Sequence, residues 1–251
     1  MVRINKGDER MDHLNEIVSS HHLLNLPPLG EQDQIAQVQL LERHLREDGR
    51  NSFILETRED RSSGCWELSF LGKFKSDLFS DLTGVIALHN INILSARILT
   101  WEDGSVVNIL MKTEALRSDD PEDVWKEVIR DLQNRVTGKL ALAPRLNLKV
   151  IPPAQSRYKE VPVNSDVIID NESSESFTLI KIISRDRLGL LYQITHTLND
   201  LRLTIRVARI STTLERVEDL FYVHDMEGRK IEEQDQIKEI KRALLQHLNQ
   251  E

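Results

Sequence analysis

Apolar residues follow two spacings in the C-terminal third of the chain, one typical of strands and the other of helices. The segments "FTLIKII" (177–183), "LTIRVARIST" (203–212) and "RVEDLFYVH" (216–224) are rich in β-branched and aromatic residues, as strands are. After the first segment, apolar residues recur every three or four positions, which predicts an amphipathic helix: Leu190, Leu191, Ile194, Leu198 and Leu201. A second helical pattern covers "EEQDQIKEIKRALLQHL" (232–248). The predicted order is strand, helix, strand, strand, helix.

The same order occurs upstream, which indicates an internal duplication. When the chain is shifted by 112 positions, "ILSARILT" (93–100) falls on "IRVARIST" (205–212) without a gap, and Thr83 falls on Thr195. This register continues into the helix that closes each copy, predicted over "PEDVWKEVIRDLQNRV" (121–136) in the first copy. In the first copy the two central strands are joined through "WEDGS" (101–105), whose Asp-Gly pair is a strong hairpin signal.

Each copy has one further strand in front of this pattern. "SFILET" (52–57) precedes the first copy and "DVIID" (166–170) precedes the second, each joined to it through a polar turn. We therefore predict two ββαββα units with the edge strand first. The fold class is α+β: two ferredoxin-like units, each an antiparallel sheet with two helices on one face.

Segments outside the two copies have a different composition. Four of the seven prolines lie between residues 143 and 165, which predicts an extended linker. Apolar residues at helical spacing predict N-terminal helices over 11–24 and 34–45. The predicted organisation is a helical N-terminal segment over 1–50, a first unit over 51–140, a linker over 141–164 and a second unit over 165–251.

Composition narrows the class of protein. With 39% hydrophobic and 29% charged residues, the 251-residue chain has the make-up of a globular protein with packed cores. No apolar run is long enough to span a membrane, and the polar N-terminus has no signal-peptide core. A single cysteine, Cys65, fits the reducing cytoplasm and is interpreted as a small apolar residue. A net charge of −8 argues against a nucleic-acid partner.

The segment "ISRDRLGLLYQIT" (183–195) is the strongest candidate for a binding site. It has neither the three glycines of a dinucleotide-binding loop nor the Lys-Ser/Thr of a phosphate-binding loop. A helix N-terminus offers free N–H groups to a carboxylate, and Gly189 would allow a ligand to approach this backbone closely. Asp186 either faces the ammonium group of an amino acid or caps the helix, and the residues alone favour neither role.

The first copy differs at this turn. "RDRLGLL" is replaced by "KFKSDLF", so that Phe74 matches Asp186 and Asp77 matches Gly189. An aspartate at this position would crowd the approach and repel a carboxylate. We therefore expect no amino-acid binding at the first copy's turn, whose helix would be capped by Ser76 or Asp77.

Other candidate chemistry is weak in this sequence. The His224-Asp225 pair ends a predicted strand, and His21-His22 is interpreted as a surface or packing pair, because a metal site needs three or more converging ligands. No G-x-S-x-G elbow is present, and no histidine flanks Cys65. We expect no catalytic residue, no metal and no cofactor.

The second copy closely resembles the second ACT domain of the bifunctional uridylyltransferase/uridylyl-removing enzyme, which modifies the nitrogen-regulatory PII protein. The resemblance rests on "IDN" (169–171), the D-R-x-G-L-L turn, the A-x-I-x-T strand and the D-x-F-Y-V strand, in the family's order. It is looser over 66–137, and "HHLLNLPPLGEQDQIAQVQLLERHL" (21–45) resembles the family's connection into its ACT pair. Nearly the whole chain is covered, as the C-terminal part of that enzyme.

The resemblance implies ACT domains that sense a small amino acid, glutamine, and regulate catalytic domains. It places the ligand-binding residues at the turn: Asp186, Leu188, Gly189, Leu190 and Leu191. Leu188 replaces the family's usual proline, and Arg202 replaces a glycine that often ends the helix, which predicts strain at that end. The chain has no Gly-Ser segment followed by D-x-D, which the nucleotidyltransferase requires.

The sequence thus predicts a cytoplasmic, non-catalytic tandem ACT protein that senses an amino acid, most plausibly glutamine, through its second copy. ACT units pair edge to edge, so we expect intramolecular pairing or a homo-oligomer. One alternative is the C-terminal regulatory part of a uridylyltransferase, which acts only with catalytic domains that this chain lacks. Its partners would be those catalytic domains or the PII protein. Another alternative is an interaction module without a ligand. An enzyme acting alone has no residue support, and no nucleic acid or membrane partner is expected.

Overall fold

A computed structural model of the protein describes residues 53–73, 75, 77–100, 106–116, 118–148, 163–213 and 216–248. The first unit contains β1 (Phe53–Asp60), β2 (Cys65–Lys73), α3 (Leu78–Leu88), β3 (Ile93–Thr100), β4 (Val106–Thr113) and α4 (Pro121–Val136). After α5 (Leu142–Leu148), the second unit contains β5 (Asp166–Asp170), β6 (Thr178–Arg185), α6 (Leu190–Asp200), β7 (Thr204–Thr213), β8 (Arg216–His224) and α7 (Gln234–Leu248). Both units have the predicted order ββαββα, and the α+β fold class is confirmed.

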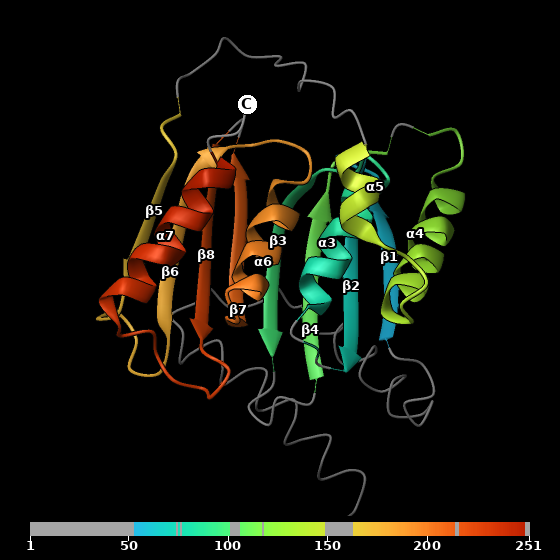
Figure 1. Cartoon of the computed structure of the whole chain (residues 1–251). Helices are drawn as coiled ribbons and strands as arrows, with labels where there is room; N and C mark the ends of the chain where they lie inside the picture. Colours follow the sequence, from blue (N-terminus) through green and yellow to red (C-terminus); the bar gives the residue numbers. More distant parts are fainter. Residues whose placement is uncertain are drawn as a thin grey trace, which may run out of the picture.

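The two units share one antiparallel sheet of eight strands, in the order β1-β2-β4-β3-β7-β8-β6-β5. Helices α3 to α7 lie on one face of this sheet (Figure 1). Strand residues that alternate toward the helices form the core, and several are completely buried: Phe70, Ile98, Ile109, Ile180, Ala208 and Phe221. The edge strands β1 and β5 pair with β2 and β6, as the sequence predicts.

Strands β3 and β7 join the two units. Arg97 lies opposite Arg209, and Ala96 lies opposite Ile210. Arg209 is also the counterpart of Arg97 in the sequence repeat, so an approximate two-fold axis passes through this pair. The register confirms the predicted duplication, and of the two expected modes of pairing it shows the intramolecular one.

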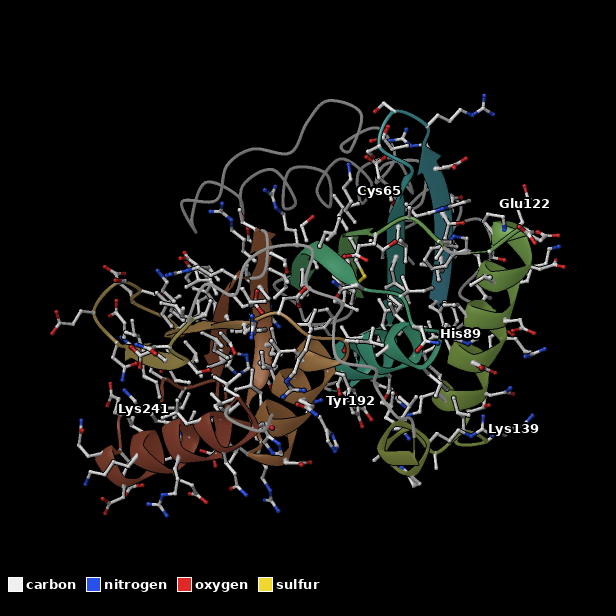
Figure 2. All side chains as sticks on the ribbon, turned by 90° about the horizontal axis from the view of Figure 1, so that it is seen from above. Cys65, His89, Glu122, Lys139, Tyr192 and Lys241 are labelled. Atoms are coloured by element: carbon white, nitrogen blue, oxygen red, sulfur yellow. The ribbon has the colours of Figure 1, made fainter. Side chains whose placement is uncertain are left out.

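Helices α3 and α6 pack against each other beside this joint, and a glycine brings them close. A Cβ atom at Gly84 would lie 2.7 Å from Cδ2 of Tyr192 and 3.0 Å from Cδ1 of Leu142. Tyr192 lies between the two helices in Figure 2. Its ring also stacks on His196, with 5.3 Å between the ring centroids. Because Gly84 has no side chain, the tyrosine ring can occupy the space beside it.

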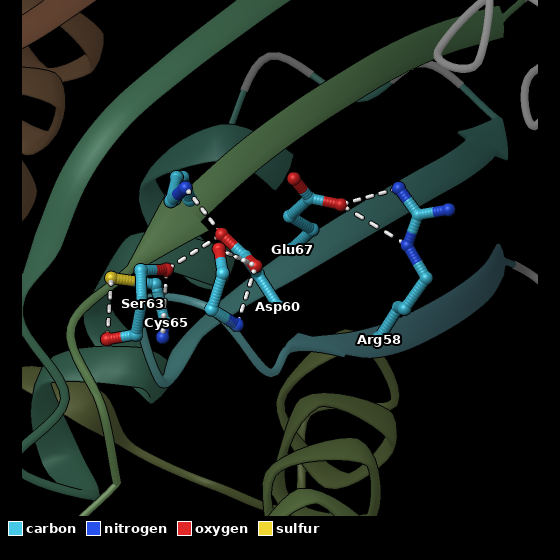
Figure 3. Close-up of polar contacts among 7 residues, drawn as sticks. Arg58, Asp60, Ser63, Cys65 and Glu67 are labelled. Carbon is cyan, nitrogen blue, oxygen red and sulfur yellow. Dashed lines mark hydrogen bonds and ion pairs between the residues drawn. The ribbon is translucent and has the colours of Figure 1, made fainter.

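The carboxylate of Asp60 organises the turn between β1 and β2 (Figure 3). Its Oδ1 accepts a hydrogen bond from the backbone N–H of Ser62 at 3.0 Å, and its Oδ2 accepts one from Oγ of Ser63 at 2.6 Å. Nζ of Lys112, from the neighbouring strand β4, lies 3.3 Å from Oδ2. Cys65 follows as a free, partly buried thiol. These contacts stabilise the hairpin between the edge strand β1 and its neighbour β2.

The prediction of an extended linker is wrong at the start of that segment. Residues Leu142–Leu148 form α5, which packs against α3. Leu142 is 2% exposed, and burying its side chain stabilises a helix there despite Pro144, which the first turn tolerates. The predicted turn over 101–105 and the predicted helices over 11–24 and 34–45 lie outside the described residues. The boundaries of the four segments stay predictions.

Candidate functional site

The turn from Asp186 to Gly189 connects β6 with α6 and differs from its counterpart in the first unit. Gly189 directly precedes α6 with a φ of 79°, in the left-handed region that glycine adopts without steric cost. Its counterpart Asp77 has a φ of −90°. Two different turns therefore join equivalent strands and helices, and only the turn of the second unit requires a glycine.

Asp186 does not cap α6. Gly189 is the N-cap residue, and the first-turn N–H groups of α6 donate no hydrogen bond to a capping side chain. The Asp186 carboxylate accepts a hydrogen bond from Nδ2 of Asn92 at 2.9 Å, across the boundary between the units. Of the two roles that the sequence left open, helix capping is excluded. The N–H of Leu190 donates to the carbonyl of Arg187 at 3.1 Å, and the other first-turn N–H groups of α6 keep their capacity to bind an anion.

A small, partly enclosed cavity of about 20 Å³ lies between this turn and the first unit. The first unit contributes Thr83, Ala87, Ile91, Asn92 and Ile93, and the second contributes Asp186, Arg187, residues 189–192, Ile210, Thr212, Val217 and Asp219. A cavity of this size holds at most one water molecule. The cavity in this structure is therefore too small to hold an amino acid.

A second carboxyl group, Asp219 on β8, also lines this cavity. It is 2% exposed, and its Oδ1 accepts a hydrogen bond from the backbone N–H of Ser211 at 3.3 Å. Burial raises the pKa of Asp219 to about 8, and the nearby charge of Asp186 acts in the same direction. Burial also raises the pKa of Asp186, against the lowering effect of the Asn92 hydrogen bond. Two carboxyl groups whose pKa values are raised by burial therefore line one cavity.

Arg187 is a further residue that lines this cavity. Its Nη2 donates to Oε1 of Gln193 at 2.6 Å and to the backbone carbonyl of His247, near the end of α7, at 2.7 Å. Burial lowers the pKa of Arg187, and the charge of Asp186 partly opposes this. The turn thus contains an acidic residue, Asp186, next to a basic residue, Arg187.

The structure brings most of the predicted ligand-binding residues together. Asp186, Gly189, Leu190 and Leu191 line the cavity, whereas Leu188 is not among the described residues that line it. Sequence reasoning missed Asn92, Arg187 and Asp219. A signal for Asp219 exists, since an acidic residue at an inward position of an otherwise apolar strand needs an explanation. Asn92 has no such signal, because its role depends on how the units pack.

Of the two caps expected at the first unit's turn, Ser76 and Asp77, the structure tests only Asp77. Asp77 occupies the N-cap position of α3 but makes no side-chain cap hydrogen bond. The other candidate, Ser76, lies outside the described residues, as does Phe74. At the helix end, Arg202 has a φ of 59°, and its counterpart Asn90 has a φ of 58°. The predicted strain at Arg202 is therefore confirmed, since a residue with a side chain adopts a backbone that favours glycine.

Other candidates form no site among the described residues. Asp225 accepts hydrogen bonds from the backbone N–H groups of Glu227 and Arg229, so the His224-Asp225 pair begins a turn, as expected. Within the described ranges, no three histidine, cysteine or acidic side chains are placed to hold a metal ion. None of the described helices is long and apolar enough to cross a membrane. His21 and His22 lie outside these ranges.

Comparison with known proteins agrees with this architecture. Residues 166–251 match the model of the ACR9-like, ACT-like domain. The bifunctional uridylyltransferase/uridylyl-removing enzyme of Rhodospirillum rubrum is 36% identical over 66% of this chain and 18% of its own length. That of Azospirillum brasilense is 31% identical over 84% of this chain and 23% of its own length.

The chain spans only about a fifth of the length of these relatives. Among solved structures, an unknown protein from Galdieria sulphuraria is 11% identical over 76% of this chain and 92% of that chain. Its TM-score of 0.23 is too low to support a conclusion. The matched domain, the two fused units and the curated relatives lead to one assignment. The chain belongs to the family of bifunctional uridylyltransferase/uridylyl-removing enzymes and corresponds to their C-terminal tandem ACT region.

Proposed function

We propose that the protein is a cytoplasmic, non-catalytic regulator that binds a small amino acid, with glutamine favoured, in the cavity between its units. The observation that carries this proposal is that acidic and basic residues line one small cavity. Asp186 and Asp219 supply carboxyl groups for an ammonium, while Arg187 and the uncapped N-terminus of α6 supply donors for a carboxylate. Such a regulator would act in nitrogen or amino-acid metabolism.

The contacts of the closed site suggest how a ligand would be held. Its ammonium would replace the amide of Asn92 as the partner of Asp186, whose carboxylate now accepts that amide at 2.9 Å. Its carboxylate would accept hydrogen bonds at the start of α6. A Cβ atom at Gly189 would lie 3.8 Å from Cβ of Ala87, so a larger side chain there would extend into the space between the units.

The size of the cavity supports a regulatory role. A volume of about 20 Å³ excludes an amino acid, so the ligand binds only after the turn moves or the units separate locally. A ligand shifts the balance between closed and open forms by its difference in affinity for them. Binding at this position would therefore change the contact between α3 and α6.

Calorimetry with L-glutamine and a panel of other amino acids tests the proposal on the parent, Gly189→Asp and Gly228→Asp. The two glycines have φ values of 79° and 80°, so the same substitution strains both backbones alike. Gly228 has open space around it, with no atom within 4 Å of a Cβ position. We expect glutamine to bind the parent and Gly228→Asp, and not to bind Gly189→Asp.

The remaining outcomes separate the rival explanations. No heat with any amino acid would contradict sensing and favour an interaction module without a ligand. Equal binding by all three proteins would place the site elsewhere.

A second candidate function is the regulation of separate catalytic domains, and it is favoured because the curated relatives are much longer than this chain. The chain matches 18% and 23% of two curated relatives, which leaves most of each relative unmatched. Mixing the protein with the catalytic part of a relative, PII protein and UTP should then restore a glutamine-dependent response. The protein alone should transfer no uridylyl group to PII protein, and transfer by it would contradict a non-catalytic role.

A further inference from the structure

Arg187 connects two places that the sequence separates widely. Its backbone belongs to the turn at the cavity, and its Nη2 reaches the carbonyl of His247 at 2.7 Å. That carbonyl lies in the last turn of α7 (Gln234–Leu248), where helix carbonyls lack partners within the helix. The guanidinium therefore acts as a side-chain cap of α7, and its positive charge suits the C-terminal end of a helix.

The donors of Arg187 are only partly used. A guanidinium has five N–H donors, of which Nη2 carries two, and these reach Gln193 and His247. Within the described residues, no acceptor is recorded for the donors on Nε and Nη1, and no carboxylate forms an ion pair with Arg187. Arginine in a partly buried position usually pairs with a carboxylate or phosphate. Arg187 lines the cavity, and the acceptors recorded for its guanidinium are neutral, so its positive charge remains available to an anion.

We propose that Arg187 couples occupation of the cavity to the C-terminal end of α7, by holding a ligand carboxylate through its free donors while Nη2 keeps its bond to His247. This inference rests on the proposed amino-acid binding and adds its regulatory output. A carboxylate forms charge-assisted hydrogen bonds about twice as strong as neutral ones, so it immobilises the guanidinium. An immobilised guanidinium protects the last turn of α7 from opening.

Coupling between the cavity and α7 must also affect the affinity for the ligand. Because linkage is reciprocal, a cap that stabilises the ligand complex must also tighten binding of the ligand. Loss of the Arg187 side chain should therefore weaken glutamine binding about 10-fold or more, because charge-assisted hydrogen bonds to the ligand carboxylate are lost. Without the Arg187 side chain, the last turn of α7 should also open more often in the ligand-free protein, because the hydrogen bond to His247 is lost. These two effects belong to different states of the protein and can be measured separately.

Hydrogen–deuterium exchange of the peptide covering residues 241–248 tests the coupling, in the parent, Arg187→Met and Arg187→Lys. In the parent, saturating L-glutamine should slow exchange of this peptide several-fold. In Arg187→Met, exchange should be faster than in the free parent and should not respond to glutamine. Arg187→Lys keeps the charge but not the several fixed donors, so it should respond only in part. Thermal unfolding of each variant shows whether it is folded.

Arg185→Met is the matched control, because Arg185 is exposed at the end of β6, two residues before Arg187. Its exchange and its response to glutamine should equal those of the parent. If glutamine binds the parent but exchange of residues 241–248 stays unchanged, the coupling is wrong and the amino-acid site stands. If glutamine does not bind the parent at all, the proposed function and the coupling both fail. If Arg187→Met leaves exchange of the free protein unchanged, Arg187 does not cap α7.

Discussion

Thr83 and Thr195 place their hydroxyl oxygens 3.4 Å apart in the buried contact between α3 and α6. The two residues are 112 positions apart, which is the period of the internal repeat. The approximate two-fold axis therefore passes between these threonines as it passes between Arg97 and Arg209. The joint between the units consists of one strand pair and one helix pair, and equivalent residues meet in both.

The threonine contact should show energetic coupling. Thr83→Val and Thr195→Val should each lower the free energy of unfolding by about 1 kcal/mol, because each leaves a buried hydroxyl without one partner. The double variant should lose less than the sum, since both hydroxyls are then replaced by groups of the same shape. Urea unfolding of the four proteins gives the coupling energy. Strictly additive losses would mean that the two hydroxyls do not interact.

Replacing Gly84 with alanine should destabilise the protein, although alanine normally stabilises a helix interior relative to glycine. The added Cβ would lie 2.7 Å from the ring of Tyr192, and overpacking of this kind costs on the order of 1–3 kcal/mol. Urea unfolding measures the loss. In a Tyr192→Leu background, which removes the ring, the same substitution should cost much less. A higher stability of Gly84→Ala in the parent background would show that the ring moves away freely.

The buried carboxyl of Asp219 should make stability depend on pH. Its pKa is about 8 in the folded protein and 3.8 as a model value, so between these pH values the folded state binds a proton that the unfolded state has lost. Stability contributed by Asp219 therefore falls as the pH rises from about 4 to about 8, by at most about 1.4 kcal/mol per pH unit.

Asp219→Asn should lack this loss, because the amide does not ionise. The measurement is urea unfolding of both proteins across this pH range. Asp81 also has a raised pKa and affects both proteins alike, whereas Asp186 interacts with Asp219, so the difference between the two curves reports Asp219 together with its interaction with Asp186. Parallel curves would mean that Asp219 titrates normally.

The ion pair between Asp81 and Arg135 should respond unequally to loss of each partner. The two side chains are 2.7 Å apart, and they are 6% and 31% exposed respectively. Burial raises the pKa of Asp81, against the opposing effect of Arg135. Arg135→Met leaves a buried carboxylate unpaired and should cost about 3–5 kcal/mol at neutral pH. Asp81→Asn should cost clearly less, because the guanidinium keeps contact with water. Unfolding in urea compares the two variants, and equal losses would contradict this account.

Much of the fold could be predicted from local patterns. The predicted closing helix over 121–136 coincides with α4, and the predicted strand over 216–224 coincides with β8. Spacing of apolar residues decides such elements, because an element must bury one face. Local pattern failed at α5, where a proline-containing segment forms a helix because Leu142 is buried against α3. That burial depends on a distant partner, which no local pattern contains.

The candidate site divides in the same way. The sequence by itself determined the duplication, the turn with its single glycine and the difference between the two copies, since these depend on residue type and spacing. Only the tertiary structure decided that Asn92 bonds Asp186 and that Asp219 lines the same cavity. It also decided that Arg187 reaches His247. These contacts join residues from different elements, and their geometry exists only after β3 and β7 pair and bring the two units into one sheet.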